Sequence, residues 1–328
     1  MVNIKGFLAG LSLAVSSTPS LAVLQQLDLQ GFVDAQGALS VQYHGDTVDP
    51  YFSLQALLLA HDNGMDISAY ALPWVNWLAP RQKLDATFDR YCLNGPVWAP
   101  CKAADADDAL LALWMRLLDT MPRQRDSNPV LRNSYAASQV ALHRLLDPHR
   151  GVYLVSPVYQ HGLFMDNLEV LSWHLPALSR KVGRGQPSAQ QLSANMRRVF
   201  WDGASKSFLV STQPEQRTVK PAFYPEYVAQ ILPLLFDFKT PGLEPNRLYN
   251  NWMRTHRAIW LAQSQHDFAW GLIAIIALRS NDRATAACWL RETAAAWNTL
   301  HWTVTDEVAR QILLKNNVNT AAPDAVCT

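Results

Sequence analysis

The stretch Asp105-Ala106-Asp107-Asp108 is followed at once by the apolar run Ala109-Leu110-Leu111-Ala112-Leu113-Trp114. Three carboxylates therefore stand where a nearly all-apolar helix begins. Asp in a first helical turn satisfies free backbone N–H groups and complements the helix dipole, and one Asp is enough for that role. The two further carboxylates make this helix start a candidate active-site mouth as well as a cap.

The same order of segments recurs along the chain, with a helix that is apolar nearly all round followed by a more polar helix. The apolar helices are predicted at 51–60, 108–118, 165–178, 227–236 and 270–278, and their partners at 66–79, 127–146, 189–200, 245–263 and 282–299. Helices buried on every side belong to an inner layer, and amphipathic helices cover them. The sequence therefore predicts an all-α fold, an α/α barrel with five clear helix pairs.

A sixth pair would be completed by either the N-terminal segment or 305–314. Short β-strands are predicted in the connecting loops, at 38–44, 84–93, 151–157 and 207–211.

Acidic residues follow the repeat of the helix pairs. Asp49, Asp107, Asp166 and Glu226 recur about 60 residues apart, each at the start of an apolar helix, and Asp267 is predicted to cap the next one. All inner helices of a closed ring begin at the same end. We therefore expect these acids to converge on one mouth of the barrel.

The N-terminus has the pattern of a bacterial secretory signal at 1–22, followed by a single domain at 23–328. Lys5 precedes the apolar run 6–15, and Ser20-Leu21-Ala22 is a small-x-small cleavage site. The apolar run is too short to span a bilayer, so no integral membrane segment remains after cleavage. The alternatives are a first core helix or an uncleaved anchor. The pattern predicts a periplasmic or secreted protein.

Cysteine spacing agrees with export. Cys92 and Cys101 flank a loop that contains Asn94-Gly95-Pro96, and their separation suits a local disulfide in an oxidising compartment. Cys288 lies on an apolar helix face and is predicted to be a buried thiol, whereas Cys327 lies in a loose tail.

Composition excludes several classes of function. The 328 residues carry a net charge of +1, so neither nucleic acid nor an anionic membrane is indicated as a partner. The sequence has no nucleophile elbow, phosphate-binding loop or dinucleotide fingerprint, and no His or Cys spacing typical of a metal site. We expect no cofactor and no metal. The predicted ligand is small or a neutral polymer.

Paired carboxylates across a cleft can hydrolyse a glycosidic bond, because one donates a proton to the leaving oxygen while the other activates water or attacks directly. Crowded acids cannot all ionise cheaply, so at least one pKa in the Asp105 to Asp108 stretch should be raised. The candidates for catalysis are Asp107, Asp105, Asp108 and Glu226, with Asp166 and Glu169 as alternates.

Aromatic side chains are a second feature that indicates carbohydrate binding, since the apolar faces of sugar rings stack on Trp and Tyr. Twelve Trp is a high number for this length, and several aromatic residues stand near the acidic helix starts. The predicted partner is therefore a carbohydrate, with His161 able to orient a substrate hydroxyl. The substrate-binding candidates are Asp49, Tyr51, Phe52, Trp98, Trp114, His161, Asn167, Trp173, Tyr224 and Trp270.

Four segments at the predicted inner helix starts resemble those of the six-hairpin glycosidases, the α/α-barrel class that includes family-eight endoglucanases and chitosanases. They are Asp49-Pro50-Tyr51-Phe52, Asp105-Ala106-Asp107-Asp108-Ala109, Met165-Asp166-Asn167-x-Glu169 and Phe223-Tyr224-Pro225-Glu226-Tyr227-Val228-Ala229-Gln230. The resemblance implies carboxylate catalysis, mostly with inversion. The family-eight general acid has no counterpart here, because the first inner helix carries Gln55 and no Glu; Asp49 is the alternative.

Other functions remain open beside a glycoside hydrolase. One is a non-catalytic glycan-binding or polysaccharide-export accessory barrel, and another is a uronate-directed hydrolase or lyase. Asp105-x-Asp107-Asp108 is also similar to the Asp-x-Asp-Asp motif of terpene cyclases, but the secretory signal and the Tyr and Trp near the helix starts argue against that class.

Overall fold

The computed structural model of the protein describes residues 25–104, 106–175, 186–218, 220–265, 267–318 and 327. The predicted signal at 1–22 and the candidate Asp105 lie outside the described residues. Within these described ranges, the structure contains no helix with the length and hydropathy needed to cross a membrane.

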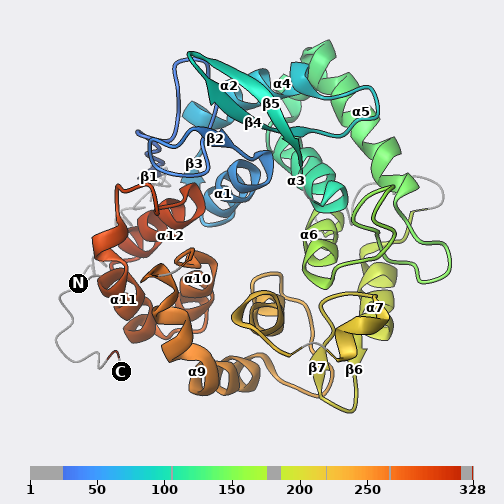
Figure 1. The fold of residues 1–328 in the computed structure, drawn as a ribbon, viewed down its shortest axis with the longest axis vertical. Coiled ribbons are helices and arrows are strands. Elements are labelled where there is room, and N and C mark those ends of the chain that lie inside the picture. The colour runs from blue at the N-terminus through green and yellow to red at the C-terminus, as the bar shows by residue number, and fades with distance from the viewer. Residues whose placement is uncertain are drawn as a thin grey trace, which may run out of the picture.

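The fold is mostly α-helical, as predicted, and its main helices form an inner and an outer layer (Figure 1). The inner helices surround the centre of the view and are α1 (Pro50–Asp62), α3 (Asp107–Thr120), α6 (Phe164–His174), α8 (Val228–Ile231), α10 (Gly271–Arg279) and α12 (Val304–Lys315). The outer helices are α2 (Ser68–Leu78), α5 (Pro129–Arg144), α7 (Ala189–Phe200), α9 (Pro245–Leu261) and α11 (Arg283–Glu292). Inner and outer helices therefore alternate along the chain.

Burial explains the two layers. Every residue from Asp108 to Met115 in α3 and from Gly271 to Ala277 in α10 is buried, because other elements pack around these helices. In α7 only Ala189, Leu192, Met196 and Phe200 are buried, which is the three-and-four spacing of an amphipathic helix.

Inner helices pack side by side, α12 against α1, α1 against α3 and α3 against α6, while α10 packs against α12. The contact between α1 and α12 joins the two ends of the described chain. Thr305 Oγ1 donates to Gln55 Oε1 at 3.4 Å, and Lys315 Nζ donates to the carbonyl oxygen of Asn63 at 2.8 Å.

The predicted helix over 227–236 is shorter than expected. Only α8 is α-helical there, between a π-helical turn at Phe223–Tyr227 and a 3₁₀ turn at Leu232–Leu234. Pro233 lacks an N–H to continue the ladder of hydrogen bonds, which ends the α-helix. The other short helices are α4 (Pro122–Ser127) and 3₁₀ turns at Ala79–Arg81, Pro214–Arg217, Gln263–Gln265 and Ala294–Ala296.

Short strands connect the helices. β1 (Gln25–Gln26) pairs in parallel with β3 (Met65–Asp66), β2 (Thr47–Val48) joins the antiparallel hairpin of β4 (Asp89–Asn94) and β5 (Val97–Ala103), and β6 (Trp201–Asp202) pairs with β7 (Ser207–Phe208).

Two strand predictions were wrong, since 38–44 and 151–157 form only isolated bridges. In the first segment Ser40 Oγ donates to the backbone carbonyls of Phe32 and Gln42, and these local bonds replace a ladder.

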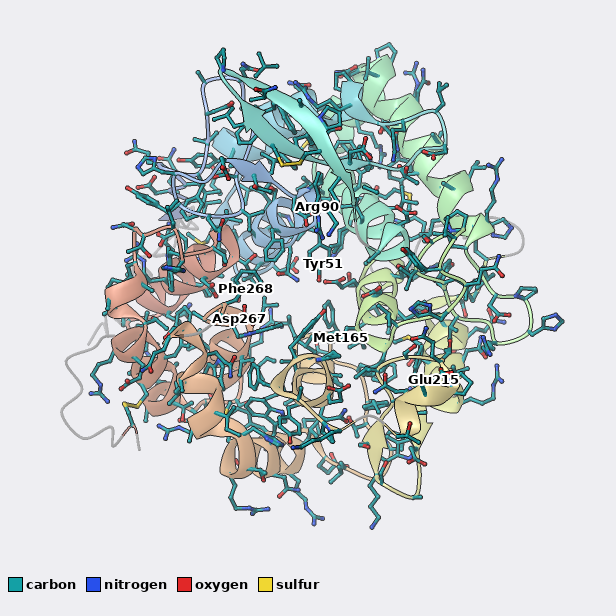
Figure 2. All side chains as sticks on the ribbon, viewed as in Figure 1. Tyr51, Arg90, Met165, Glu215, Asp267 and Phe268 are labelled. Carbon is teal, nitrogen blue, oxygen red and sulfur yellow. A yellow bond between two sulfur atoms is a disulfide. The ribbon has the colours of Figure 1, made fainter. Side chains whose placement is uncertain are left out.

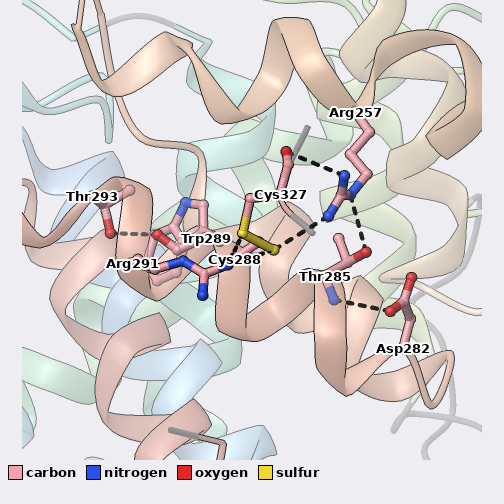
Figure 3. Close-up of a disulfide and its surroundings, with 8 residues drawn as sticks. All are labelled: Arg257, Asp282, Thr285, Cys288, Trp289, Arg291, Thr293 and Cys327. Atoms are coloured by element: carbon pink, nitrogen blue, oxygen red, sulfur yellow. Dashed lines mark hydrogen bonds between the residues drawn. A yellow bond between two sulfur atoms is a disulfide. The ribbon is translucent and has the colours of Figure 1, made fainter. Parts of the chain in front are cut away.

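Two disulfides lie within the described residues. Cys92 and Cys101 are joined across the β4–β5 hairpin. The burial predicted for Cys288 of α11 is confirmed, but the predictions of a free thiol there and of a loose tail at Cys327 were wrong, because these two residues are bonded to each other (Figure 3). Arg257 of α9 reaches the same place and donates to Cys288 Sγ at 3.3 Å and to the carbonyl oxygen of Cys327 at 3.3 Å. The C-terminal end is thereby fixed to the outer layer.

Candidate active site

A pocket of about 290 Å³ lies where the inner helices begin, and we call it the front pocket. The first turns of α1, α6, α10 and α12 all contribute to its lining, together with the β4–β5 hairpin. Tyr51, Arg90, Met165, Asp267 and Phe268 surround the opening at the centre of the ring (Figure 2). The helix starts are therefore brought together at one end of the fold.

Asp166 and Glu169 reach the front pocket from one face of α6, because residues three apart on a helix are neighbours. Glu169 is 4% exposed, and its Oε1 accepts hydrogen bonds from Tyr51 Oη at 2.7 Å and Gln55 Nε2 at 3.3 Å. Its Oε2 accepts none from any residue that the structure describes. Within the described chain, that atom is therefore buried beside the pocket without a hydrogen-bond partner.

Burial raises the pKa of Glu169 to about 8, and the nearby charge of Asp166 acts in the same direction. The hydrogen bonds from Tyr51 and Gln55 and the charge of Arg116 oppose this rise. Glu169 is therefore protonated at neutral pH, which is the state that a general acid needs.

Asp108 lies fully buried in the first turn of α3. Neither carboxyl oxygen accepts a hydrogen bond of good geometry from the described part of the chain. Burial first, and then the charges of Asp166, Glu169 and Asp107, raise its pKa well above the usual range, although the Ala109 N–H opposes the shift. Asp108 thus adjoins the acids of the pocket without lining it.

Asp107 is the first residue of α3 and is partly buried, but of the described residues 106–108 only Ala106 lines the front pocket. Ala106 has a φ of 53°, in the left-handed region, so the backbone turns sharply as it enters α3. That turn places Asp108 in the core and leaves the wall of the pocket to α6.

Asp49 performs two tasks at the start of α1. Its Oδ1 caps the helix by accepting from the Tyr51 N–H at 3.1 Å, and Pro50 takes the first helical position. Its Oδ2 lies 2.7 Å from Arg90 Nε, and the two side chains form an ion pair. The Nε–H bond of Arg90 does not have the direction of an aligned hydrogen bond. The sequence analysis missed Arg90, because only the pairing of β4 with β2 brings it to Asp49.

Asp306 of α12 is a second pocket residue that the sequence analysis missed. Its Oδ1 accepts from the Gly271 N–H at 2.7 Å, and its Oδ2 accepts from Thr303 Oγ1 at 2.6 Å. Burial raises its pKa to about 6 against these hydrogen bonds. The spacing Thr303-x-x-Asp306 is the signal that was available, because Ser or Thr three residues before an acid marks a helix start.

Aromatic rings form one side of the front pocket. Tyr224 is 55% exposed, and its ring centroid lies 5.1 Å from that of Trp270. Phe52 lies between Tyr51 and Phe268, with centroid distances of 5.8 and 5.5 Å. Trp270 itself stands at the N-cap of α10 with a φ of 56°, where Asp267 was expected to cap the helix. Asp267 is instead exposed in the lining of the pocket.

Glu226 is not brought to the pocket lining. In the π-helical turn its Oε1 accepts from Gln216 Nε2 at 3.2 Å, and its Oε2 accepts from the Ala222 N–H at 3.1 Å. Both carboxyl oxygens are therefore used in holding the segment that precedes the turn.

Five of the substrate-binding candidates also lie outside the pocket lining. Trp98, Trp114 and Trp173 are buried, and their Nε1 atoms donate to Asp34, Ser134 and Asp119 respectively. Asn167 is buried and holds the backbone of Tyr153, while the ring of His161 contacts that of Tyr159.

Comparison with known proteins identifies a shared fold. No protein-family model and no curated protein matches the chain. Among solved structures, the fold is similar to one described as a novel alpha-amylase from Clostridium perfringens, with a TM-score of 0.57 and 8% sequence identity. The match covers 88% of this chain and 94% of that chain. At this identity the likeness concerns the fold, and function has to be argued from the site.

Proposed function

We propose that the protein is a glycoside hydrolase that cleaves a poly- or oligosaccharide in the front pocket. The observation that carries this proposal is the buried Glu169, whose pKa is raised to about 8, beside Asp166 on the wall of a pocket that aromatic rings also line. An acid ready to donate a proton, a second carboxylate and rings that stack on sugars are the parts that acetal hydrolysis requires. The shared fold with an alpha-amylase supports the same conclusion.

We propose further that the two layers are those of an α/α barrel in the six-hairpin sense. Five inner helices each have an outer partner, and α12 takes the sixth inner position next to α1. In such a barrel the helix starts share one mouth, where the front pocket lies. The whole region 23–328 would then act as one catalytic domain.

In the proposed reaction, Glu169 donates its proton to the leaving glycosidic oxygen, and Asp166 activates a water molecule. Asp166 and Glu169 lie on one face of α6, whereas inversion needs a base on the side of the sugar ring opposite the acid. This pair therefore does not support the inversion that the sequence analysis expects. Asp49 and Arg90 would fix the substrate at the start of α1, and the Tyr224 and Trp270 rings would stack on a sugar face. Asp107 and Asp108 do not line the pocket, and the charges of Asp166, Glu169 and Asp107 act on the buried Asp108.

The charge of the pocket argues against a uronate substrate. Its lining contains five carboxyl groups and one guanidinium, that of Arg90, which already pairs with Asp49. An anionic sugar would meet further negative charge. A neutral glycan suits this surface better.

A second candidate is a glycan-binding barrel without catalytic activity. It is favoured by Gln55, which stands on the first inner helix, where the resemblance to family eight would place the general acid. Gln55 Nε2 donates to Tyr51 Oη at 3.0 Å and to Glu169 Oε1 at 3.3 Å. In this candidate the same network would hold a sugar without cleaving it.

Release of reducing ends from a panel of soluble neutral glycans tests the proposal. Wild type should be active, Glu169→Gln and Asp166→Asn should lose at least about a hundredfold in kcat/KM, and Glu226→Gln should retain activity as the matched control. Binding of a glycan without its cleavage would support the non-catalytic candidate. Loss of activity in Glu226→Gln alone would reject the assignment to α6.

We also propose export to the periplasm or the medium. The signal pattern at 1–22 and two disulfides are compatible with an oxidising compartment. N-terminal sequencing of the mature protein checks this, with Val23 as the expected first residue.

A further inference from the structure

A second cavity of about 340 Å³ lies at the other end of the inner helices, and we call it the rear cavity. It is lined by the later turns of α1, α3 and α6, by the segment after α8 and by the end of α10. Gln55, Glu169, Phe236 and Leu272 line both this cavity and the front pocket. Glu169 therefore borders a space on each side.

An ion pair lies in the wall of the rear cavity. Arg116 Nη2 of α3 is 2.7 Å from Asp62 Oδ2 of α1, with side-chain exposures of 19% and 30%. Burial alone would raise the pKa of Asp62, but the hydrogen bonds and charges of His61 and Arg116 lower it overall. The pair thus places a fixed positive and a fixed negative charge beside the cavity that Glu169 borders.

Glu169 is surrounded by groups from several elements. Those that act on it directly are Tyr51 and Gln55 of α1, Arg116 of α3 and Asp166 of α6, and the charge of Glu169 acts in turn on Asp108 of α3. Charged groups across the front pocket are Asp49, Arg90, Asp267 and Asp306. Those across the rear cavity are Asp62, Asp237 and Arg279. Arg116 differs from the other direct neighbours in being a cation, and its charge favours the carboxylate form of Glu169.

We propose that Asp62 and Arg116 act through the rear cavity to set how tightly Glu169 holds its proton, which makes both of them positioning residues for the acid step. Arg116 draws Glu169 toward its ionised form, and Asp62 cancels part of that effect. The catalytic meaning of this inference rests on the proposed function. The electrostatic link itself does not.

Two opposite substitutions test the link. The quantity to compare is the titration midpoint of Glu169, the pH at which its carboxyl group is half ionised. Asp62→Asn removes the negative charge that compensates Arg116, so this midpoint should fall. Arg116→Met removes the cation, so the midpoint should rise. Each shift should be on the order of half a pH unit, because the groups are partly shielded by water. Arg116→Lys keeps the charge and should restore the wild-type midpoint. Lys83→Met removes a surface cation paired with Asp89 elsewhere and should change nothing.

The midpoint can be measured without any substrate, by ¹³C NMR of protein labelled at the glutamate carboxyl carbon. The chain has six glutamates, and Glu169→Gln identifies the signal. Unchanged midpoints in both variants, or shifts in the same direction, would overturn the inference.

Activity separates this inference from the proposed function. Where glycan hydrolysis is found, the alkaline limb of kcat/KM should move with the NMR midpoint. If the midpoints shift in opposite directions but no glycan is hydrolysed, the electrostatic link is supported and the proposed hydrolase function is rejected. If glycan is hydrolysed but the midpoints do not shift in opposite directions, the hydrolase function is supported and the electrostatic link is rejected.

Discussion

Replacing Glu169 by glutamine should make the protein more stable above neutral pH. In the unfolded chain the carboxyl has its ordinary pKa of 4.5, and in the folded chain the pKa is about 8. Between these values the folded state holds a proton that the unfolded state has released. Raising the pH therefore favours unfolding, and the stability contributed by the neutral carboxyl is lost as the pH passes through 8.

The difference between the two pKa values, 4.5 and about 8, corresponds to about 5 kcal/mol in the free energy of unfolding. About 4 kcal/mol of this is lost between pH 5 and pH 8.5. The glutamine side chain in the variant keeps an oxygen for the hydrogen bonds from Tyr51 and Gln55 but cannot ionise. The melting temperature of the variant minus that of wild type should therefore grow by roughly 6 to 8 °C between these pH values.

Thermal unfolding at pH 5 and pH 8.5 measures this difference. Asp306 titrates in both proteins, so the subtraction removes most of its effect, whereas the pKa of Asp108 depends in part on the charge of Glu169. Glu244→Gln, at an exposed glutamate before α9, is the matched control and should give a difference that does not depend on pH. A constant difference for Glu169→Gln would mean that the folded protein ionises this group at neutral pH, which refutes its role as the acid.

Three further predictions concern the aromatic side, the α10–α12 contact and the disulfides. Trp270→Ala should weaken glycan binding about tenfold in calorimetry, whereas Tyr159→Ala, outside the pocket, should not. Gly271→Ala should lower the free energy of unfolding in urea by about 1 to 3 kcal/mol, because a Cβ there would lie 2.6 Å from Ala309 Cβ. Gly203→Ala is the control, since a Cβ at Gly203 would meet nothing within 4 Å. Equal effects of the two substitutions would contradict the packing argument. Replacing Cys288 and Cys327 by Ser should lower the free energy of unfolding by about 4 kcal/mol, and replacing Cys92 and Cys101 should lower it by about 2.5 kcal/mol. The reason is that the longer loop, of 39 against 9 residues, loses more entropy when a disulfide closes it. The reverse order in urea unfolding would contradict this entropic explanation.

Local sequence signals located most of the helices. Asp49-Pro50 marked the start of α1, and the apolar runs marked α3 and α10. Helix capping and the burial of a whole helix both depend on residues that are close together in the sequence. The same signals placed Asp166 and Glu169 on one face of a helix. They could not rank these acids above Glu226, because the π-helical turn that directs Glu226 away depends on its contacts with Gln216 and Ala222.

Contacts between distant segments were beyond local signals. Arg90 meets Asp49 through strand pairing, and Asp306 meets Gly271 through the packing of α12 on α10. The bond between Cys288 and Cys327 also depends on where the end of the chain lies. The start of α3 does border the front pocket, but of the described residues 106–108 only Ala106, whose backbone is left-handed, lines it.

The packing of α1 on α12 sets the order in which the molecule can be assembled. Thr305 and Gln55 meet across 250 residues, so the first inner helix leaves the ribosome long before its neighbour exists. Until α12 is made, the front pocket lacks Thr305 and Asp306, and the faces of α1 and α10 that pack against α12 are uncovered. A nascent chain of this topology cannot close prematurely. The delay is compatible with the export that we propose above.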